Sequence, residues 1–428
     1  MKIAIIGAGS GYMPGVIRGL LHRADDLAGA ELAFHDIDAG NLALMARLAT
    51  NMFTARSATT EPATFTITTH TDLKPALDGA AYILTTFRPG GMAARHLDES
   101  IPLKHGVVGQ ETAGPGGFMM ACRSIPVLLE IAAHAEPSAW IVNYTNPTNI
   151  VTDAVTRNTG IRIIGLCDQF VGDTEMWAQL LGLPYERLEV DWIGLNHATW
   201  AERVRLDGKE IDLPALLGDL EIPGGGATPW RDPSRMAELA KALGFLPNSY
   251  SKYYFFHDQV VEELRAKGTT RSEDIQAMLP RFFAQIAEES TKPDPDPSRE
   301  RGGGKHGEFA IDVICTLHRN ESRRVIVNTT NNGAISSLPP EAIVEVPSLL
   351  TAAGPVPLAQ GPLPRAVRGL TQSIHEYERL ASDAAVTGSR QLALQALMAH
   401  PFVTSKKTAE KILDEGLAAH RAHLPQFS

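Results

Sequence analysis

The clearest indication of the fold is the segment Lys2-Ile-Ala-Ile-Ile-Gly-Ala-Gly-Ser10. Its apolar run predicts a buried strand, and Gly7 and Gly9 follow where a nucleotide-binding βα unit turns from strand to helix. Glycine permits the tight turn and lets backbone N–H groups approach a pyrophosphate at the helix N-terminus. The third glycine of the usual pattern would fall at Tyr12, so the segment alone also fits an ordinary βα turn.

An acidic residue supports the nucleotide interpretation. Asp36 ends a second predicted strand, Glu31–His35, where a carboxylate accepts a hydrogen bond from the ribose of NAD and disfavours the 2′-phosphate of NADP. Asp38 is an alternative, and both acids also suit a solvated turn. We predict an NAD site that contains Gly7, Gly9, Ser10 and Asp36.

The first half of the chain alternates short apolar runs with helical patterns. This alternation predicts an α/β fold with a Rossmann-like, doubly wound parallel sheet, as in lactate and malate dehydrogenases. The predicted helices are 14–23 and 43–53. Further strands are predicted at 81–87, 140–144, 162–166 and 188–193.

The second half changes character. Breaker-rich stretches at 222–229 and 292–307 predict surface loops, a strand is predicted at 324–328, and helices are predicted at 365–384 and 391–399. We divide the chain into an NAD-binding domain, residues 1–196, and a C-terminal α+β domain for substrate, metal and oligomer contacts, residues 197–428.

The amino-acid composition argues against several classes of function. The net charge of −10 over 428 residues argues against nucleic-acid binding, which needs basic surfaces. Three cysteines far apart suggest no disulfide framework and an intracellular compartment. No cleavable signal pattern or apolar span of membrane length follows the first strand. We therefore expect a cytoplasmic protein with no membrane or nucleic-acid partner.

Polar and metal-binding residue types follow the predicted strands. Ligands of doubly wound sheets bind at the carboxyl ends of the strands. Cys167 and His197 each resemble structural filler when taken alone, but both follow Gly-Leu at a predicted strand end. One thiolate and one imidazole would hold a metal ion and leave positions open for substrate oxygens. The other residues at these ends are Arg88, Arg95, Asn146, Asp168 and Asn196.

An ordered set of motifs resembles glycoside hydrolase family 4. The set begins with the glycine segment and includes Tyr250 with Tyr253-Tyr254. The other matching stretches are Phe87-Arg-Pro-Gly-Gly91 with Arg95, Asp98-Glu99, Ile101-Pro-Leu-Lys104, Gly109-Gln-Glu-Thr112, Gly114-Pro-Gly-Gly117, Asn146-Pro147, Gly165-Leu-Cys-Asp168, Gly194-Leu-Asn-His197, Asn331-Asn-Gly333 and Val344-Glu-Val-Pro347.

The resemblance implies an NAD-dependent glycosidase mechanism, an exception to hydrolysis by two carboxylates. It starts with hydride transfer from the sugar C3 to NAD+, which acidifies the C2 proton. A base removes that proton, the C1–oxygen bond breaks by elimination, water adds, and NADH returns the hydride. The cofactor is regenerated in each turnover.

The resemblance also assigns residue roles. Cys167 and His197 bind the metal, usually manganese, and Tyr250 is the C2 base. A phenol has a pKa of about 10, so it needs a nearby cation to ionise. Asp168 resembles the general acid of enzymes that cleave α-glycosides, whereas β-active relatives typically carry Asn; the alternative role is a helix N-cap.

The resemblance also implies a sugar substrate with an anionic group at C6. Arg95 and Arg271 resemble positions that recognise a C6 phosphate, and Asn146 lies at the same strand ends. The resemblance thus favours a 6-phospho-α-glucosidase. Gly11-Tyr-Met-Pro14 and Gln169-Phe170 depart from the usual Thr-x-Thr-Pro and Met-Pro of phospho-glycosidases, so a C6 sulfonate, as in α-sulfoquinovosides, and a C6 carboxylate remain alternatives.

Two other classes share the nucleotide fold. A simple NAD-dependent dehydrogenase would need neither the Cys/His pair nor Tyr250, and it would accumulate NADH. A non-catalytic NAD-binding regulator would not need polar groups at the strand ends. The family's members are commonly dimers or tetramers, so we expect a homodimer or homotetramer.

Overall fold

The first half of the chain forms the predicted parallel sheet. The computed structural model describes residues 1–57, 65–222, 232–297 and 306–427. The parallel strands lie in the order β3-β2-β1-β4-β5-β6, which is that of a dinucleotide-binding fold. They are β1 (Lys2–Ile6), β2 (Glu31–His35), β3 (Thr66–His70), β4 (Tyr82–Thr85), β5 (Trp140–Asn143) and β6 (Arg162–Gly165).

Burial explains why these segments are strands. β1, β4 and β5 are buried along almost their whole length, as expected for strands covered by helices on both faces. β3, with the sequence Thr-Ile-Thr-Thr-His, is largely exposed at the sheet edge and has too few apolar residues to be predicted.

The sheet continues beyond β6 with strands from the second half of the chain. β13 (Arg323–Thr330) pairs antiparallel with β6, and β14 (Ile343–Thr351) pairs antiparallel with β13. The others are β8 (Ile193–Leu195), β9 (Ala198–Ala201), β12 (Leu246–Pro247) and β15 (Gly354–Pro357). One mixed sheet thus crosses residue 196, and the division into domains there stays a prediction.

One predicted strand is wrong. The segment 188–193 is not a single strand of the parallel sheet. β7 (Leu188–Val190) belongs to a separate three-stranded sheet with β10 (Val204–Leu206) and β11 (Lys209–Glu210), and β8 follows in the large sheet. Buried Trp192 links them, so the apolar run is continuous although the strand is not.

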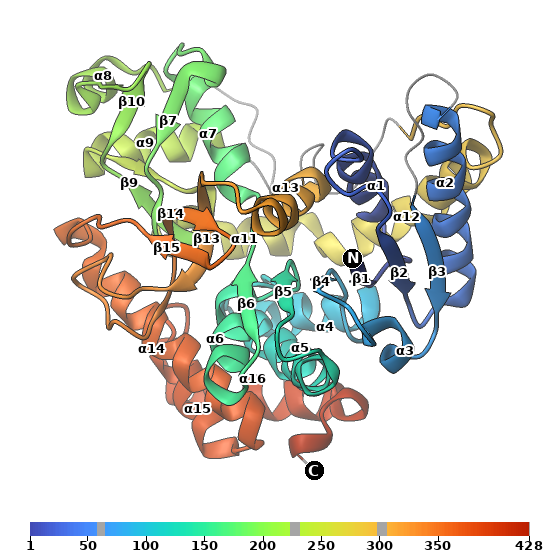
Figure 1. Cartoon of the computed structure of the whole chain (residues 1–428). Coiled ribbons are helices and arrows are strands. Elements are labelled where there is room, and N and C mark those ends of the chain that lie inside the picture. The colour runs from blue at the N-terminus through green and yellow to red at the C-terminus, as the bar shows by residue number, and fades with distance from the viewer. Residues whose placement is uncertain (58–64, 223–231, 298–305, 428) are drawn as a thin grey trace.

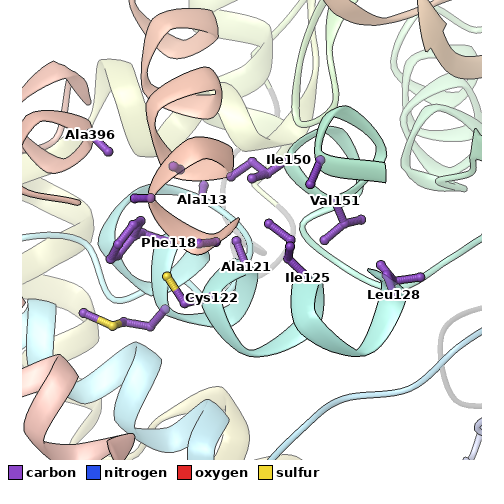
Figure 2. Close-up of a cluster of buried hydrophobic side chains, with 14 of the residues drawn as sticks. Ala113, Phe118, Ala121, Cys122, Ile125, Leu128, Ile150, Val151 and Ala396 are labelled. Carbon is purple, nitrogen blue, oxygen red and sulfur yellow. The ribbon is translucent and has the colours of Figure 1, made fainter. Parts of the chain in front are cut away.

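Helices cover the two faces of the large sheet. On one face, α14 (Arg365–Thr387) and α15 (Arg390–Ala399) pack beside α5 (Gly114–His134) and α6 (Thr148–Asn158) (Figure 1). Figure 2 shows that Phe118, Ala121 and Ile125 of α5 lie in a buried cluster with Ile150 and Val151 of α6. On the other face, α1 (Met13–His22) packs against α13 (His306–Arg319). α12 (Arg271–Glu289) contacts both α4 (Gly91–Lys104) and α2 (Ala39–Ser57).

The helices have the following bounds: α1 (Met13–His22), α2 (Ala39–Ser57), α3 (Leu73–Leu77), α4 (Gly91–Lys104), α5 (Gly114–His134), α6 (Thr148–Asn158), α7 (Gln169–Leu180), α8 (Leu213–Asp219), α9 (Pro233–Leu243), α10 (Lys252–Phe255), α11 (His257–Lys267), α12 (Arg271–Glu289), α13 (His306–Arg319), α14 (Arg365–Thr387), α15 (Arg390–Ala399) and α16 (Lys406–Ala419). The expected loops at 222–229 and 292–307 fall largely outside the described residues.

Among the described helices, α5 alone is long and apolar enough to cross a membrane by length and composition. Most of its apolar window, 67%, is buried inside the protein. Its side chains form the cluster of Figure 2, so the helix serves as a core element here.

Candidate active site

The glycine segment makes a tight turn between β1 and α1. Gly7 has a φ of +95°, and a Cβ there would lie 2.5 Å from the carbonyl oxygen of Thr86. The N–H groups of Gly7 and Ala8 both donate to the carbonyl oxygen of His35 at 2.9 Å. Only glycine fits this close approach of β1 to its neighbour β4.

The acid at the end of β2 faces this turn. The backbone N–H of Gly9 donates to Asp36 Oδ2 at 2.8 Å, and a Cβ on Gly9 would lie 2.9 Å from the same oxygen. Asp38 instead accepts from the N–H groups of Gly40 and Asn41 at the start of α2. Asp36, not Asp38, therefore faces the glycine turn.

Ser10 offers a further indication of a ligand. Its Oγ is buried and has no hydrogen-bond partner within the part of the chain that the structure describes. A buried hydroxyl of this kind normally has a partner. The turn, the orphaned hydroxyl and the adjacent carboxylate together fit a dinucleotide.

Cys167 and His197 meet at the carboxyl end of β6. Cys167 Sγ lies 3.6 Å from His197 Nε2. Typical metal–sulfur and metal–nitrogen bonds at a tetrahedral angle place those two atoms about 3.6 Å apart. The pair therefore fits one metal ion, although His197 comes from the β8–β9 turn and not from a parallel strand.

The electrostatics of the pair suit a metal. Burial lowers the pKa of His197 to about 4, so its imidazole is neutral at pH 7 and can act as a ligand. Burial, with the charges of Glu345 and Asp168, raises the pKa of Cys167, so a cation is needed to form its thiolate. Among the described residues, no group of three or more His, Cys, Asp and Glu side chains is placed to hold a metal ion.

The backbone of His197 has a positive φ, because the residue lies in a tight turn between two strands. Its φ is +64°, in the left-handed region that is uncommon for residues other than glycine. Asn196 and His197 form the two-residue connection between β8 and β9, which aims the imidazole at Cys167. Such local strain is typical of functional sites.

Tyr250 stacks on His197. Their ring centroids are 3.9 Å apart and the ring planes differ by 2°. Burial raises the pKa of Tyr250 above its ordinary value, and the neighbouring Tyr253 and Glu111 add to the effect. The phenol is therefore protonated in the metal-free protein, which agrees with the expectation that ionisation requires a cation.

Asp168 follows Cys167 at the N-cap of α7. Its side chain makes no capping hydrogen bond, so the structure does not use it as a helix cap. Its negative charge raises the pKa values of Cys167 and His197, which places the carboxylate beside the metal pair. It is partly exposed, as a proton donor to a substrate must be.

Arg95 lies in a buried ion cluster that sequence reasoning did not identify. Its Nε donates to Glu99 at 2.9 Å, and its Nη2 pairs with Glu111 at 3.1 Å. Arg88 pairs with the other oxygen of Glu111. Burial raises the pKa of Glu111, but these arginines outweigh burial and lower it to about 2.

Arg271, the second predicted substrate arginine, lies close to this cluster. Arg271 begins α12, and its charge lowers the pKa values of Glu111 and Tyr253. Asn146 is partly buried before α6, and its Oδ1 accepts from Thr148 Oγ1 at 3.3 Å. Arg271 thus lies near Glu111 and Tyr253.

Glu345 is a second acid that sequence reasoning missed. It lies on β14, fully buried, and its Oε1 accepts from Asn196 and Asn328, each at 3.3 Å. Burial raises its pKa to about 8. Its sequence signal was the motif Val344-Glu-Val-Pro347, in which a charged residue interrupts a buried strand.

The chain matches known proteins along nearly its whole length. The family model "Family 4 glycosyl hydrolase" matches residues 2–183, and "Family 4 glycosyl hydrolase C-terminal domain" matches residues 192–403. A "Probable 6-phospho-beta-glucosidase" of Bacillus subtilis is 38% identical, over 100% of this chain and 98% of that protein.

Solved structures agree. A 6-phospho-alpha-glucosidase from gut microorganisms, in complex with NAD and glucose-6-phosphate, has a TM-score of 0.87 and 30% identity, with 100% of both chains covered. The 6-phospho-beta glucosidase from Thermotoga maritima, with manganese, NAD+ and glucose-6-phosphate, has a TM-score of 0.86 and 28% identity, with 99% of both chains covered.

A malate dehydrogenase of Cryptosporidium parvum shares the fold alone, with a TM-score of 0.53 and 12% identity over 90% of this chain and 98% of that one. The predicted Rossmann-like fold is therefore confirmed, and NAD with manganese agrees with the contents of the related structures. The predicted family and the predicted glycosidase class are confirmed as well. The chain belongs to family 4 of the glycosyl hydrolases.

Proposed function

We propose that this chain is an NAD- and manganese-dependent 6-phospho-α-glucosidase that cleaves its substrate by transient oxidation. One observation carries the proposal: Cys167, His197, Tyr250 and Asp168 converge beside an arginine-rich cluster, at the strand ends next to the dinucleotide turn. Relatives of 28–30% identity over the whole chain hold NAD and glucose-6-phosphate.

The bound groups and the protein divide the chemistry. When bound, NAD+ accepts the C3 hydride, and the metal ion polarises the C3 oxygen and supplies positive charge next to Tyr250. Cys167 and His197 hold the metal. The turn with Gly7 and Gly9, the Ser10 hydroxyl and Asp36 hold the dinucleotide.

Proton transfers fall to two side chains. Tyr250 removes the proton from C2 with its phenolic oxygen, held against His197 by stacking. Asp168 donates a proton to the departing glycosidic oxygen from its partly exposed position. Arg95 and Arg271 bind the C6 phosphate, because guanidinium groups suit oxyanions. Asn146 also binds the substrate.

Cleavage of β-glycosides is the second candidate. The relative with 38% identity is named a probable 6-phospho-beta-glucosidase and covers the whole chain. Asp168 favours the α-anomer, because in the family resemblance an aspartate at this position accompanies cleavage of α-glycosides and an asparagine accompanies cleavage of β-glycosides.

The test compares chromogenic glucosides that differ at C1 and at C6. Both anomers would carry a phosphate, a sulfonate, a carboxylate or a hydroxyl at C6, with NAD+, manganese and a reductant present. We expect cleavage of the α-anomer with phosphate, dependent on both cofactors. Preference for the β-anomer, the sulfonate or the carboxylate would refute the proposed substrate but would not contradict the proposed mechanism. Steady NADH production from free sugars without cleavage would favour a dehydrogenase.

Location and assembly follow the same reasoning. Phosphorylated sugars are intracellular metabolites, and the three cysteines are buried and unpaired by disulfides, so we propose a cytoplasmic enzyme. We also propose a homodimer or homotetramer, for which light scattering of the purified protein is the direct measurement.

A further inference from the structure

The turn that carries Tyr250 is held from two sides. Residues Asn248 to Ser251 connect β12 to α10, and a short 3-10 helix, Ser249–Ser251, places Tyr250 at its centre. Asn248 caps this helix, because its Oδ1 accepts from the N–H of Tyr250 at 2.9 Å. The position of the phenol thus depends on what holds Asn248 and Ser249.

The first set of hydrogen bonds to this turn comes from α7. Asp173 Oδ2 accepts from the N–H of Ser249 at 3.2 Å, and Asp173 Oδ1 accepts from Gln169 Nε2 at 2.9 Å. Gln169 Nε2 also donates to Ser249 Oγ at 2.5 Å. Gln169, Asp173 and Ser249 thus close a hydrogen-bonded ring, which we call the α7 clamp.

The second set of hydrogen bonds to this turn comes from β9. Asn248 Nδ2 donates to Thr199 Oγ1 at 3.0 Å, and the N–H of Asn248 donates to the Thr199 carbonyl at 3.2 Å. Thr199 lies two residues after His197, on the strand that leaves the metal turn. The turn is therefore fixed relative to His197.

The α7 clamp fixes the same turn relative to Cys167. The N–H of Gln169 donates to Cys167 Sγ at 3.5 Å, so one residue contacts both the sulfur and the turn of Tyr250. Asp173 is 2% exposed, although a buried carboxylate costs free energy unless it is well paired. Buried Lys252 contributes a compensating positive charge.

We infer that Gln169, Asp173 and Ser249 are positioning residues that hold Tyr250 in register with the metal pair. The inference rests on the proposed role of Tyr250 as C2 base. A displacement of about 1 Å of a reacting group can cost about 100-fold in rate. The clamp does not touch the dinucleotide turn, so its loss changes proton abstraction and leaves NAD binding intact.

The experiment removes and then restores the clamp. Asp173→Ala breaks the ring, whereas Asp173→Asn keeps an acceptor and an amide that Gln169 can meet. Thr174→Val is the matched control, because Thr174 on the same helix accepts a buried hydrogen bond from Trp192 Nε1 at 2.9 Å, away from Tyr250. Measurements are kcat, KM, NAD+ affinity and the isotope effect of a C2-deuterated substrate.

We expect Asp173→Ala to lower kcat about 100-fold and to raise the C2 isotope effect, with NAD+ affinity unchanged. Asp173→Asn should regain most of the rate, and Thr174→Val should keep the isotope effect of the wild type. An unchanged isotope effect in Asp173→Ala, or no rescue by Asn, would overturn the inference. If Asp173→Ala does not fold, Gln169→Met removes both side-chain donations of the clamp and is judged by the same criteria.

A crystal structure of the same variant separates this inference from the proposed function. We expect the ring of Tyr250 to leave His197 in Asp173→Ala and to stay stacked, near 3.9 Å, in Asp173→Asn. Stacking kept in the Ala variant would contradict the clamp whatever the enzyme cleaves. An inactive wild type with the expected ring movement would refute the proposed function alone.

Discussion

At the scale of single residues, burial sets the charge state of the site. His197 and Tyr250 are both neutral in the metal-free protein because burial lowers the pKa of the imidazole and raises that of the phenol. A bound cation favours the ionised forms of the Cys167 thiol and the Tyr250 phenol. The metal therefore has an electrostatic role as well as a coordinating one.

Asp168 gives a prediction that depends on the leaving group. A general acid contributes about 100- to 10,000-fold when the leaving group is a poor one. We expect Asp168→Asn to lose that factor on a 6-phosphorylated disaccharide and to lose much less on a nitrophenyl glycoside, whose leaving group needs no proton. Steady-state rates on the two substrates measure this, and equal losses would argue for a structural role.

Glu111 gives a prediction about pH. Its pKa is about 2 in the folded protein, below the ordinary 4.5, because Arg88 and Arg95 outweigh burial. A lowered carboxyl pKa stabilises the fold above pH 4.5, and this stability is lost as the pH falls towards 2. We expect Glu111→Gln to lower the free energy of unfolding by about 3 kcal/mol at pH 7.

Denaturant unfolding at several pH values checks the Glu111 prediction. The difference between wild type and variant should shrink as the pH falls below about 4.5. A difference that does not change between pH 7 and pH 3 would show that packing, not charge, is responsible.

At the scale of elements, two connections build the site. The turn between β1 and α1 approaches β4, and the turn between β8 and β9 brings His197 to the end of β6. Both turns use a residue with a positive φ, Gly7 and His197. The sheet ladder fixes the distance between them.

Gly7→Ala tests the first connection. The substitution adds a clash with the Thr86 carbonyl to the strain of a positive φ. We expect a larger loss of stability than in Gly29→Ala, where φ is +75° and no heavy atom lies within 4 Å of the added Cβ. NAD+ affinity should fall in Gly7→Ala only, as isothermal titration would show; equal effects would refute the close-approach argument.

At the scale of the whole molecule, a second buried ion cluster joins distant parts of the chain. It consists of Arg123, Asp98 and His420. Arg123 of α5 donates to Asp98 of α4 at 2.6 and 2.8 Å, and His420 Nε2 lies 3.1 Å from Asp98. Arg123 Nε also donates to the Pro89 carbonyl, in the loop that carries Arg88. The segment after α16 thus supports the arginine cluster of the site.

Arg123→Met tests this support. It leaves the Asp98 carboxylate buried without its main partner, so we expect a loss of about 3–5 kcal/mol in the free energy of unfolding. Arg187→Met removes an exposed pair with Asp207 and should leave the unfolding midpoint unchanged. Thermal melts of both variants measure the contrast, and similar melting temperatures would count against the role of the cluster.

The sequence predicts the parallel half of the molecule better than the antiparallel half. Strands such as β1 and β5 are apolar runs between turn signals, so the sequence identifies them as buried strands of a parallel sheet. The contact between β6 and β13 rests on one pair, Gly165 with Asn328, from residues far apart in the chain. No local pattern encodes such a pairing.

The same limit explains the site residues. Cys167 and His197 were predicted as a pair, but the strand assigned to His197 was wrong because 188–193 divides between two sheets. Glu111 and Glu345 are single acids without periodicity, and only the folded chain shows that arginines surround one and asparagines the other. The roles of these residues in catalysis stay predictions.

The most direct test is cleavage of a 6-phospho-α-glucoside in heavy water. Removal of the C2 proton by Tyr250 and its later replacement from solvent predict one deuterium at C2 of the product, an absolute requirement for NAD+, and no net accumulation of NADH. Mass spectrometry and absorbance follow these quantities in a single reaction. A product without deuterium, formed without NAD+, would contradict the account, because the C1–oxygen bond would then break without oxidation.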